Sequence, residues 1–457
     1  MVDLGGIEAV IEPTVGLGSF LAAAPEAARA APWICFDIHA DYVETARNAA
    51  KLAGINGAQI EQKDAFTLSP ADLTHLNPAA PVLAIGNPPW VTSAAQAHAG
   101  RANLPVKSNG DFALRGLDAL TGQANFDIAE AILLRIIAAL DGFADWRLAF
   151  LVKRSVAMKL ARRLLGRAEV LSFSSIDAFQ HFGASVDAGL FYARVSTSAA
   201  PAIDIAIADE LGGPIVRRAG LRDTRFVEDL DAYSRVAALE AARLVAWRQG
   251  IKHDLAKVLE LRAEGDGWKN GFGEMVDVEE DALAPLYKSS DLAHGRPSGR
   301  MLPLYQTDLT GPVPDLDDRW PRLAAYLRAH EAAFASRRSR IYCGKHPFML
   351  FGVGPYVLAP WKVAVSGLYK TPAFRVLGPD DLGRPALVDD TCYLLPFDTE
   401  YAAKTVADHL NGESAQQFIA SIADGSAKRP FTKAVLSRVA VPCPPLETAP
   451  GQLVLVT

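Results

Sequence analysis

The chain has 457 residues, of which 50% are hydrophobic and 21% are charged. At about 150 residues per domain, this length suggests two or three domains, and the composition excludes a disordered or collagen-like chain. The four cysteines lack metal-knuckle spacing, so we expect reduced thiols in a cytoplasm and neither a disulfide framework nor a zinc ribbon. The N-terminus has no signal-peptide pattern, and no apolar run reaches the roughly 20 residues that span a membrane.

The charge balance is slightly acidic, with 46 basic and 52 acidic residues and a net charge of −6. Proteins that hold nucleic acid by electrostatics are usually basic overall, so any such binding must come from local patches. The net charge therefore neither requires nor excludes a DNA partner.

In the first half of the chain, short apolar strands alternate with helical segments. Predicted strands cover 9–11, 33–36, 82–85, 148–152 and part of 185–195, and predicted helices cover 41–53 and 127–140. This alternation predicts a parallel α/β sheet with helices on both faces. Ligands of such sheets bind at the carboxyl ends of the strands.

The pattern changes in two places. A long segment with little apolar periodicity, 92–124, is typical of a functional or a mobile loop. After about residue 200 the chain has helical segments near 230–249, a turn-rich region at 264–314, a helix near 320–335 and strand-like aromatic residues from 342 onward. We therefore predict two domains, 1–200 and 201–457.

A glycine motif follows the first predicted strand. Gly16 and Gly18 are spaced so that the backbone can approach a ligand, although many such pairs form only tight turns. Asp37 ends the next strand, where an acid can hydrogen-bond ribose hydroxyls. The combination fits a nicotinamide dinucleotide or S-adenosylmethionine. Leu21 replaces the third glycine of the dinucleotide pattern, which weighs against a dehydrogenase.

Asp64 is a third acid in this series. Its carboxylate could accept a hydrogen bond from the amino group of a cofactor adenine, with Phe66 beside the ring. Taken alone, Asp64 is more simply interpreted as a loop acid.

The turn Asn87-Pro88-Pro89-Trp90 follows a buried strand. Two successive prolines remove two backbone donors and make the turn rigid. Their carbonyl oxygens and the Asn87 amide form a fixed set of acceptors for the NH₂ group of a planar substrate, and Trp90 offers a face for stacking. The alternative is a plain proline turn capped by Asn87, which the ordered motifs before it make less favourable.

In this order the motifs resemble those of the class I S-adenosylmethionine-dependent methyltransferases that act on exocyclic amines. The chain looks most like the adenine-N6 DNA methyltransferases of the γ order, the Taq-type enzymes. Further segments share this resemblance: 104–109, 116–119, 124–128, 150–155 and 182–186 in the first half, and 285–291 and 389–393 in the second.

The resemblance implies a Rossmann-like class I methyltransferase sheet with a C-terminal α+β target-recognition domain. It implies S-adenosylmethionine as the cofactor, bound by Glu12, Pro13, Gly16, Gly18, Phe20, Asp37, Ile38, Asp64, Ala65 and Phe66. The catalytic turn would be Asn87, Pro88, Pro89 and Trp90, with Trp90 and Phe182 sandwiching the extruded base.

The glycine motif begins close to the N-terminus, at Glu12. Members of the γ order carry a preceding segment that closes one side of the cofactor pocket. We expect either that the chain starts late or that another part supplies that wall.

Basic residues suggest where DNA would bind. Arg101, Lys107 and Arg115 lie in the long segment after the catalytic turn, and we favour phosphate contacts for them. Lys153 and Arg154 begin a basic segment, 153–167, for which a solvated helix face is the simpler interpretation. For 336–340 and 428–430, both interpretations stay open.

The predicted function is transfer of a methyl group to the N6 amine of a flipped adenine in double-stranded DNA, in restriction–modification. The expected setting is a bacterial cytoplasm, with the enzyme acting as a monomer, a cognate restriction endonuclease as a possible further partner, and no metal or membrane. Two alternatives remain. A methyltransferase for RNA adenine or a protein glutamine amide would use the same turn, and a DNA-binding remnant would not bind the cofactor.

Overall fold

The computed structural model describes residues 4–90, 127–425 and 427–443. The chain forms two compact units, which divide between Asp231 and Ala232. The sequence placed this boundary after residue 200. The difference arises because three more strands extend the first sheet: β8 (Asp204–Ala208), β9 (Ile215–Arg222) and β10 (Arg225–Val227).

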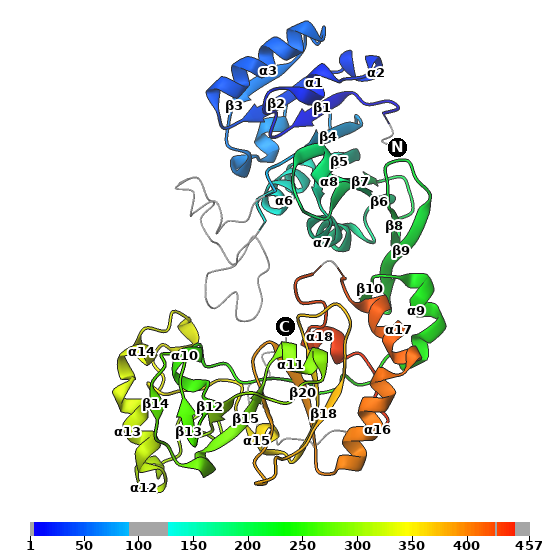
Figure 1. The fold of residues 1–457 in the computed structure, drawn as a ribbon. Helices are drawn as coiled ribbons and strands as arrows, with labels where there is room; N and C mark the ends of the chain where they lie inside the picture. The colour runs from blue at the N-terminus through cyan, green and yellow to red at the C-terminus, as the bar shows by residue number, and fades with distance from the viewer. Residues whose placement is uncertain (1–3, 91–126, 426, 444–457) are drawn as a thin grey trace. The chain divides into compact units, whose positions relative to one another are not determined.

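The centre of the first unit is a parallel sheet (Figure 1). Its parallel strands lie in the order β3-β2-β1-β4-β5, with β1 at Ala9–Glu12, β2 at Trp33–Asp37, β3 at Gln59–Gln62, β4 at Val82–Gly86 and β5 at Asp145–Lys153. β7 (Ala188–Ser196) runs antiparallel between β5 and β6 (Val170–Ile176).

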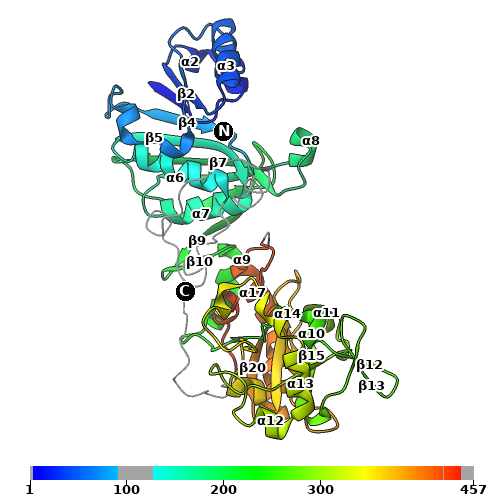
Figure 2. The same ribbon diagram turned by 90° about the vertical axis from the view of Figure 1, so that its left-hand side faces the viewer.

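Helices cover both faces of this sheet. Successive strand residues point to opposite faces, so Val10 packs in the core beside α3 (Ala40–Leu52), whereas Ile11 packs in the core beside α6 (Ile128–Leu140). Figure 2 shows α6 next to α7 (Arg154–Leu164) along β5 and β7. The predicted Rossmann-like α/β fold is therefore confirmed.

The predicted elements of the first unit agree with the structure to within a few residues at most ends. The sequence did not reveal β3 or β6. In β3 only Ile60 is buried, and β6 alternates serines with Leu171 and Phe173, so neither forms a continuous apolar run.

The second unit combines small sheets with separate helices. One sheet has the order β11-β20-β17-β18, with β11 at Arg248–Gln249, β20 at Cys392–Phe397, β17 at Trp361–Ser366 and β18 at Arg375–Leu377. A second sheet joins β16 (Met301–Pro303), β15 (Leu283–Tyr287) and β19 (Leu387–Val388), and a third joins β12 (Arg262–Glu264), β13 (Gly267–Lys269) and β14 (Met275–Val276). The helices include α16 (Glu400–Asn411) and α17 (Glu413–Ile422).

Predictions for the second half were less accurate. The helix near 320–335 exists, but it is divided at His330 into α13 (Pro321–Ala329) and α14 (Glu331–Ala335). The expected helical region at 230–249 is wrong in part, because after α9 (Leu230–Val236) and one 3-10 turn it ends in β11, which pairs with β20. Within the described ranges, no helix is long and apolar enough to cross a bilayer.

Candidate functional site

The predicted cofactor and catalytic residues meet at one edge of the first sheet. Glu12 ends β1, Asp37 ends β2, Asp64 follows β3 and Asn87 follows β4. These four strands are parallel neighbours, so their carboxyl ends share an edge. The structure thus brings together residues that lie up to 75 positions apart.

The glycine turn closes on Asp37. Gly16 N donates to Asp37 Oδ2 at 3.0 Å, and His39 N donates to Asp37 Oδ1 at 2.9 Å. Gly18 has a φ of 81°, and a Cβ there would lie 2.9 Å from the Ala49 Cβ on α3. Glycine at this position therefore satisfies both the left-handed backbone and the close approach to α3.

Glu12 presents a buried acceptor without a partner. Its side chain is 1% exposed, and neither its Oε2 atom nor the nearby Thr14 Oγ1 has a hydrogen bond within the described residues. Burial, and secondarily the charge of Asp37, raises the pKa of Glu12 well above its usual value. A buried carboxyl of this kind is complementary to a cationic ligand, because a positive charge offsets the cost of ionising it. These residues therefore fit the cationic methionine part of the cofactor that the sequence implies.

We predict that Glu12→Gln weakens S-adenosylmethionine binding roughly 10- to 100-fold, the value of one charge-assisted hydrogen bond. A cation binds better to ionised Glu12, so wild-type affinity should increase with pH up to the raised pKa. Binding below that pKa should release a proton. Calorimetry in buffers of different ionisation enthalpy measures this release, which the variant should lose. Equal proton release by both proteins would contradict the assignment.

The remaining cofactor candidates shape the same edge. Asp64 caps the 3-10 turn Ala65–Thr67, because Phe66 N donates to its Oδ1 at 2.9 Å. This contact is what the simpler interpretation of Asp64 as a loop acid predicts. Phe66 packs against the main core, and Ala65 is buried within it. The Ile38 carbonyl accepts from Gln62 Nε2 at 3.0 Å. Pro13 is buried, and Phe20 packs in the core beside α3.

The residue before Asn87, Gly86, packs against β5. A Cβ at Gly86 would lie 2.9 Å from Phe150 Cε1, so the turn can follow β4 only with glycine there. Pro88 is buried and Pro89 is exposed. Asn87 is half-buried, and its carboxamide makes no hydrogen bond to the residues that the structure describes. Its oxygen therefore remains available to a substrate.

Trp90 and Phe182 lie against each other. Trp90 Nε1 donates to the Leu151 carbonyl of β5 at 3.0 Å, which fixes the indole. The Phe182 ring, on the short helix α8 (Ala178–Phe182), meets it edge to face with centroids 5.3 Å apart. Phe182 is 48% exposed. The two aromatic residues predicted to hold a base are thus neighbours, although they are separated by 92 positions.

A contact that the sequence did not reveal lies beside this pair. Asp127 caps α6 through Ala129 N and also contacts Lys153 Nζ at 2.6 Å. The cap itself has a sequence signal, an aspartate directly before an apolar periodic run, whereas the ion pair has none. Arg154 is 8% exposed and lies over the Phe173 ring. Both predicted DNA contacts at 153–154 are therefore engaged within the first unit, and Arg101, Lys107 and Arg115 lie outside the described residues.

Three further cations of the basic segment are also paired. Lys159 contacts Glu130 at 2.6 Å, Arg162 contacts Glu228 at 2.7 Å and Arg167 contacts Asp141. These pairs favour a structural role for much of this face. No group of three or more His, Cys, Asp or Glu side chains in the described ranges could hold a metal ion.

No protein-family model matches the chain. It is 35% identical over 447 residues to the type II methyltransferase M.NspV of Nostoc sp. (strain ATCC 29411 / PCC 7524), covering 96% of this chain and 92% of that protein. Among solved structures it is similar to the DNA-bound ATP-dependent type ISP restriction-modification enzyme LlaBIII, with a TM-score of 0.45, 11% identity and coverage of 86% of this chain and 31% of that one. It is also similar to the M protein of the type I restriction enzyme EcoKI, with a TM-score of 0.31, 13% identity and coverage of 44% of each chain.

The chain spans less than half the length of these two solved structures, whereas it matches M.NspV almost from end to end. An identity of 35% over this length shows common descent. The methyl donor is S-adenosylmethionine, as the sequence indicated and as the buried Glu12 carboxyl fits. The chain belongs to the family of type II methyltransferases.

Proposed function

We propose that this methyltransferase modifies the N6 amino group of an adenine that has left the stack of double-stranded DNA. The single observation that carries the proposal is the Asn87 carboxamide, which has no hydrogen-bond partner among the residues that the structure describes. It lies in a rigid proline turn, at the sheet edge that also holds Glu12 and Asp37. A planar amine substrate supplies the two N–H donors that such a turn lacks.

The chemistry follows from the acceptors. The lone pair of an adenine amine is delocalised into the ring, which makes the nitrogen a poor nucleophile. S-adenosylmethionine supplies an electrophilic methyl group. Asn87 Oδ1 and the Pro88 carbonyl would accept the two amine hydrogens and favour a pyramidal nitrogen with a localised lone pair. Placement of these acceptors, rather than a strong base, would supply most of the rate enhancement.

The aromatic pair would hold the base only after it separates. A base between two rings needs about 7 Å, two van der Waals contacts, whereas the Trp90 and Phe182 centroids lie 5.3 Å apart. Trp90 is fixed by Leu151, so Phe182 is the ring that would move. Gly183, with a φ of 65°, follows it directly and ends α8.

We predict that Phe182→Ala reduces the rate of methyl transfer roughly 10- to 100-fold, the value of one lost base–aromatic stack. The dissociation constant for S-adenosylmethionine should not change. Phe179→Ala is the matched control, because Phe179 lies on the same helix and is 68% exposed. Equal rates for the two variants would contradict the stacking role of Phe182.

The proposal extends to the second unit as the part that recognises the target in DNA. Enzymes acting on RNA adenine or on a glutamine amide use the same turn, so the turn does not distinguish these substrates. The second unit has its own core and sheets, which favours a large duplex substrate. M.NspV is named a type II methyltransferase, and we propose the same restriction–modification context here, with the enzyme acting as a monomer beside a separate endonuclease.

The proposal is tested by tritium transfer from labelled S-adenosylmethionine to unmethylated genomic DNA. The expected result is label in DNA that digests to N6-methyladenine. Parallel reactions contain total RNA and a glutamine-bearing protein extract. Label in either of those, with none in DNA, would overturn the DNA assignment. Calorimetry with S-adenosylmethionine accompanies the assay, because absence of binding would identify a remnant.

A further inference from the structure

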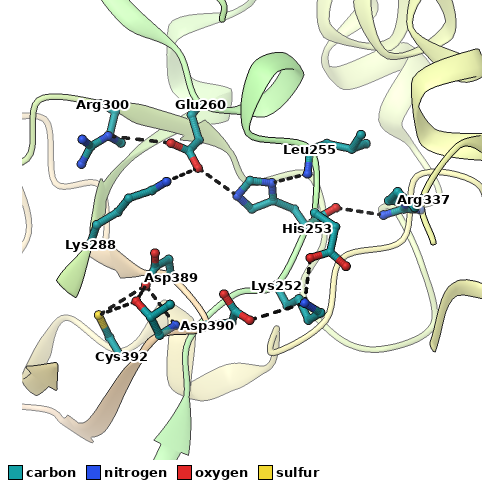
Figure 3. A network of polar contacts seen from close by, with 12 residues as sticks. Lys252, His253, Leu255, Glu260, Lys288, Arg300, Arg337, Asp389, Asp390 and Cys392 are labelled. Atoms are coloured by element: carbon teal, nitrogen blue, oxygen red, sulfur yellow. Dashed lines mark hydrogen bonds and ion pairs between the residues drawn. The ribbon is translucent and has the colours of Figure 1, made fainter. Parts of the chain in front are cut away.

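Many cations of the second unit are paired with carboxylates. Figure 3 shows Lys288 and Arg300 directed at Glu260, and Lys252 directed at Asp390. The Lys288 Nζ lies 2.5 Å from Glu260 Oε1. These charges are therefore neutralised within the fold.

The stretch between Glu331 and Asp380 has a different charge balance. It contains seven Lys and Arg residues and no Asp or Glu, in a chain whose acids outnumber its bases. Four of the seven donate to backbone carbonyls: Arg337, Lys362, Lys370 and Arg375. The other three are exposed: Arg338, Arg340 and Lys345. Within the described ranges, the side chains of these three form no ion pair and no hydrogen bond.

A closed loop, 337–349, carries all three exposed cations. The Arg337 guanidinium joins the ends of the loop, because it donates to the Pro347 carbonyl at 2.6 Å and to the Met349 carbonyl at 2.7 Å. Its central carbon also lies 3.6 Å from the centroid of the Tyr342 ring, in the middle of the loop. Arg337 therefore has a structural role, and the three exposed cations lie on a loop that it fixes.

Two overlapping turns form the tip of this loop. Cys343 N donates to the Arg340 carbonyl at 3.1 Å, and Lys345 N donates to the Tyr342 carbonyl at 3.2 Å. Each such turn brings its first and last residues within about 7 Å, so Arg340 and Lys345 lie on the same tip. A Cβ at Gly344 would meet no atom of the described residues within 4 Å. Like charges are thus held close together where a ligand can reach them.

Phosphate groups fit these charges. A phosphate carries the negative charge that neighbouring cations attract, and the planar donors of arginine match its oxygens. A duplex presents one negative charge per about 1.7 Å of helix axis, so the cations of one loop can contact more than one phosphate. We propose that Arg338, Arg340 and Lys345 contact backbone phosphates of DNA.

The inference rests on the proposed function, because it takes DNA as the substrate. It selects the phosphate-contact interpretation for 336–340, which the sequence left open, except at Arg337, whose guanidinium is used within the loop.

The test is the salt dependence of binding to a short labelled random-sequence duplex, measured by fluorescence anisotropy. Each phosphate contact contributes about 0.9 to the slope of log Kd against log salt. Arg340→Gln and Lys345→Gln should each reduce that slope by about 0.9, which weakens binding roughly fivefold at about 0.15 M salt. The triple variant, with Arg338→Gln added, should reduce the slope by about 2.7 and weaken binding roughly 100-fold.

Lys404→Gln is the matched control. It removes one exposed charge from α16 that is already paired, since Lys404 Nζ contacts Glu400 at 2.6 Å. Circular dichroism and thermal melting check that each variant folds. Slopes for the loop variants equal to that of Lys404→Gln overturn the phosphate contacts, while methyl transfer to DNA by the same proteins leaves the proposed function standing. A wild-type enzyme that binds no duplex overturns the proposed function itself, and tighter binding to an RNA duplex, lost in the triple variant, assigns the loop to RNA instead.

Discussion

Replacing Asn87 by alanine should lower the turnover number for methyl transfer about 1,000-fold, the loss found when one positioned hydrogen-bonding group is removed from an active site. The Asn87 carboxamide has no hydrogen-bond partner in the described part of the chain, so its removal should leave the fold intact. S-adenosylmethionine should bind with an unchanged dissociation constant, because the residues that we propose to hold it, Glu12 and Asp37, lie on neighbouring strands. Rapid-quench single-turnover transfer and calorimetry measure the two quantities.

Two further variants sharpen this result. Asn87→Asp keeps an oxygen acceptor at nearly the same place and should retain more activity than Asn87→Ala. Asn56→Ala removes an exposed asparagine before Gly57 and should behave as the wild type. If Asn87→Ala transferred methyl groups within a factor of about ten of the wild-type rate, the proposal that Asn87 accepts a hydrogen bond from the substrate amine would be wrong.

Replacing Lys362 by methionine should stabilise the second unit at pH 7 by at most about 4 kcal/mol, the cost of keeping this amine buried, less the cost of leaving the Ala359 carbonyl without a donor. Lys362 lies on β17, is 0% exposed, and donates to the Ala359 carbonyl at 2.5 Å. Burial lowers the pKa of Lys362 from 10.5 to about 7. Methionine fills a similar volume and needs no solvation.

The sign of the pH dependence follows from the same values. Between about pH 7 and pH 10.5 the unfolded chain binds a proton at Lys362 that the folded chain does not. The unfolding free energy of the wild type should therefore increase with pH across this window, by about 3 kcal/mol between pH 7 and pH 9.5.

Urea titrations of the full chain at both pH values measure this dependence, with the exposed Lys404→Met as the control. Lys362→Met should show a flatter pH profile than the wild type. Identical pH dependence in the two proteins would show that Lys362 does not titrate as described.

The fold of the first unit could be predicted because short stretches of sequence mark each of its parallel strands and the turn that follows it. Short apolar strands, each followed by a marked turn, place Glu12, Asp37, Asp64 and Asn87 in order along the chain, and parallel pairing then puts them at one edge. The contacts that fix the site are not local. Trp90 reaches Leu151 across 61 positions, and Lys153 reaches Asp127 across 26. Such pairs depend on strand register and helix position, which no spacing in the sequence reveals.

The second unit shows a different difficulty. Its strands are short, and β11 pairs with β20 across more than 140 positions. Lys362 illustrates the consequence. Alternation along β17 would place Lys362 with Ser366 on a solvent-facing side, yet both are buried. Burial here is decided by the segments that pack over the strand, so local polarity is a poor guide.

The attachment of Trp90 and Asp127 to one strand has an evolutionary consequence. Trp90 contacts Leu151 and Asp127 contacts Lys153, so the two boundaries of 91–126 are both fastened to β5 within three residues of each other. The turn that we propose as catalytic and the start of α6 should therefore keep their positions when the sequence between them changes. The DNA contacts predicted from the sequence, Arg101, Lys107 and Arg115, belong to that interval, so we expect substitutions at these positions to leave the turn at Asn87 in place.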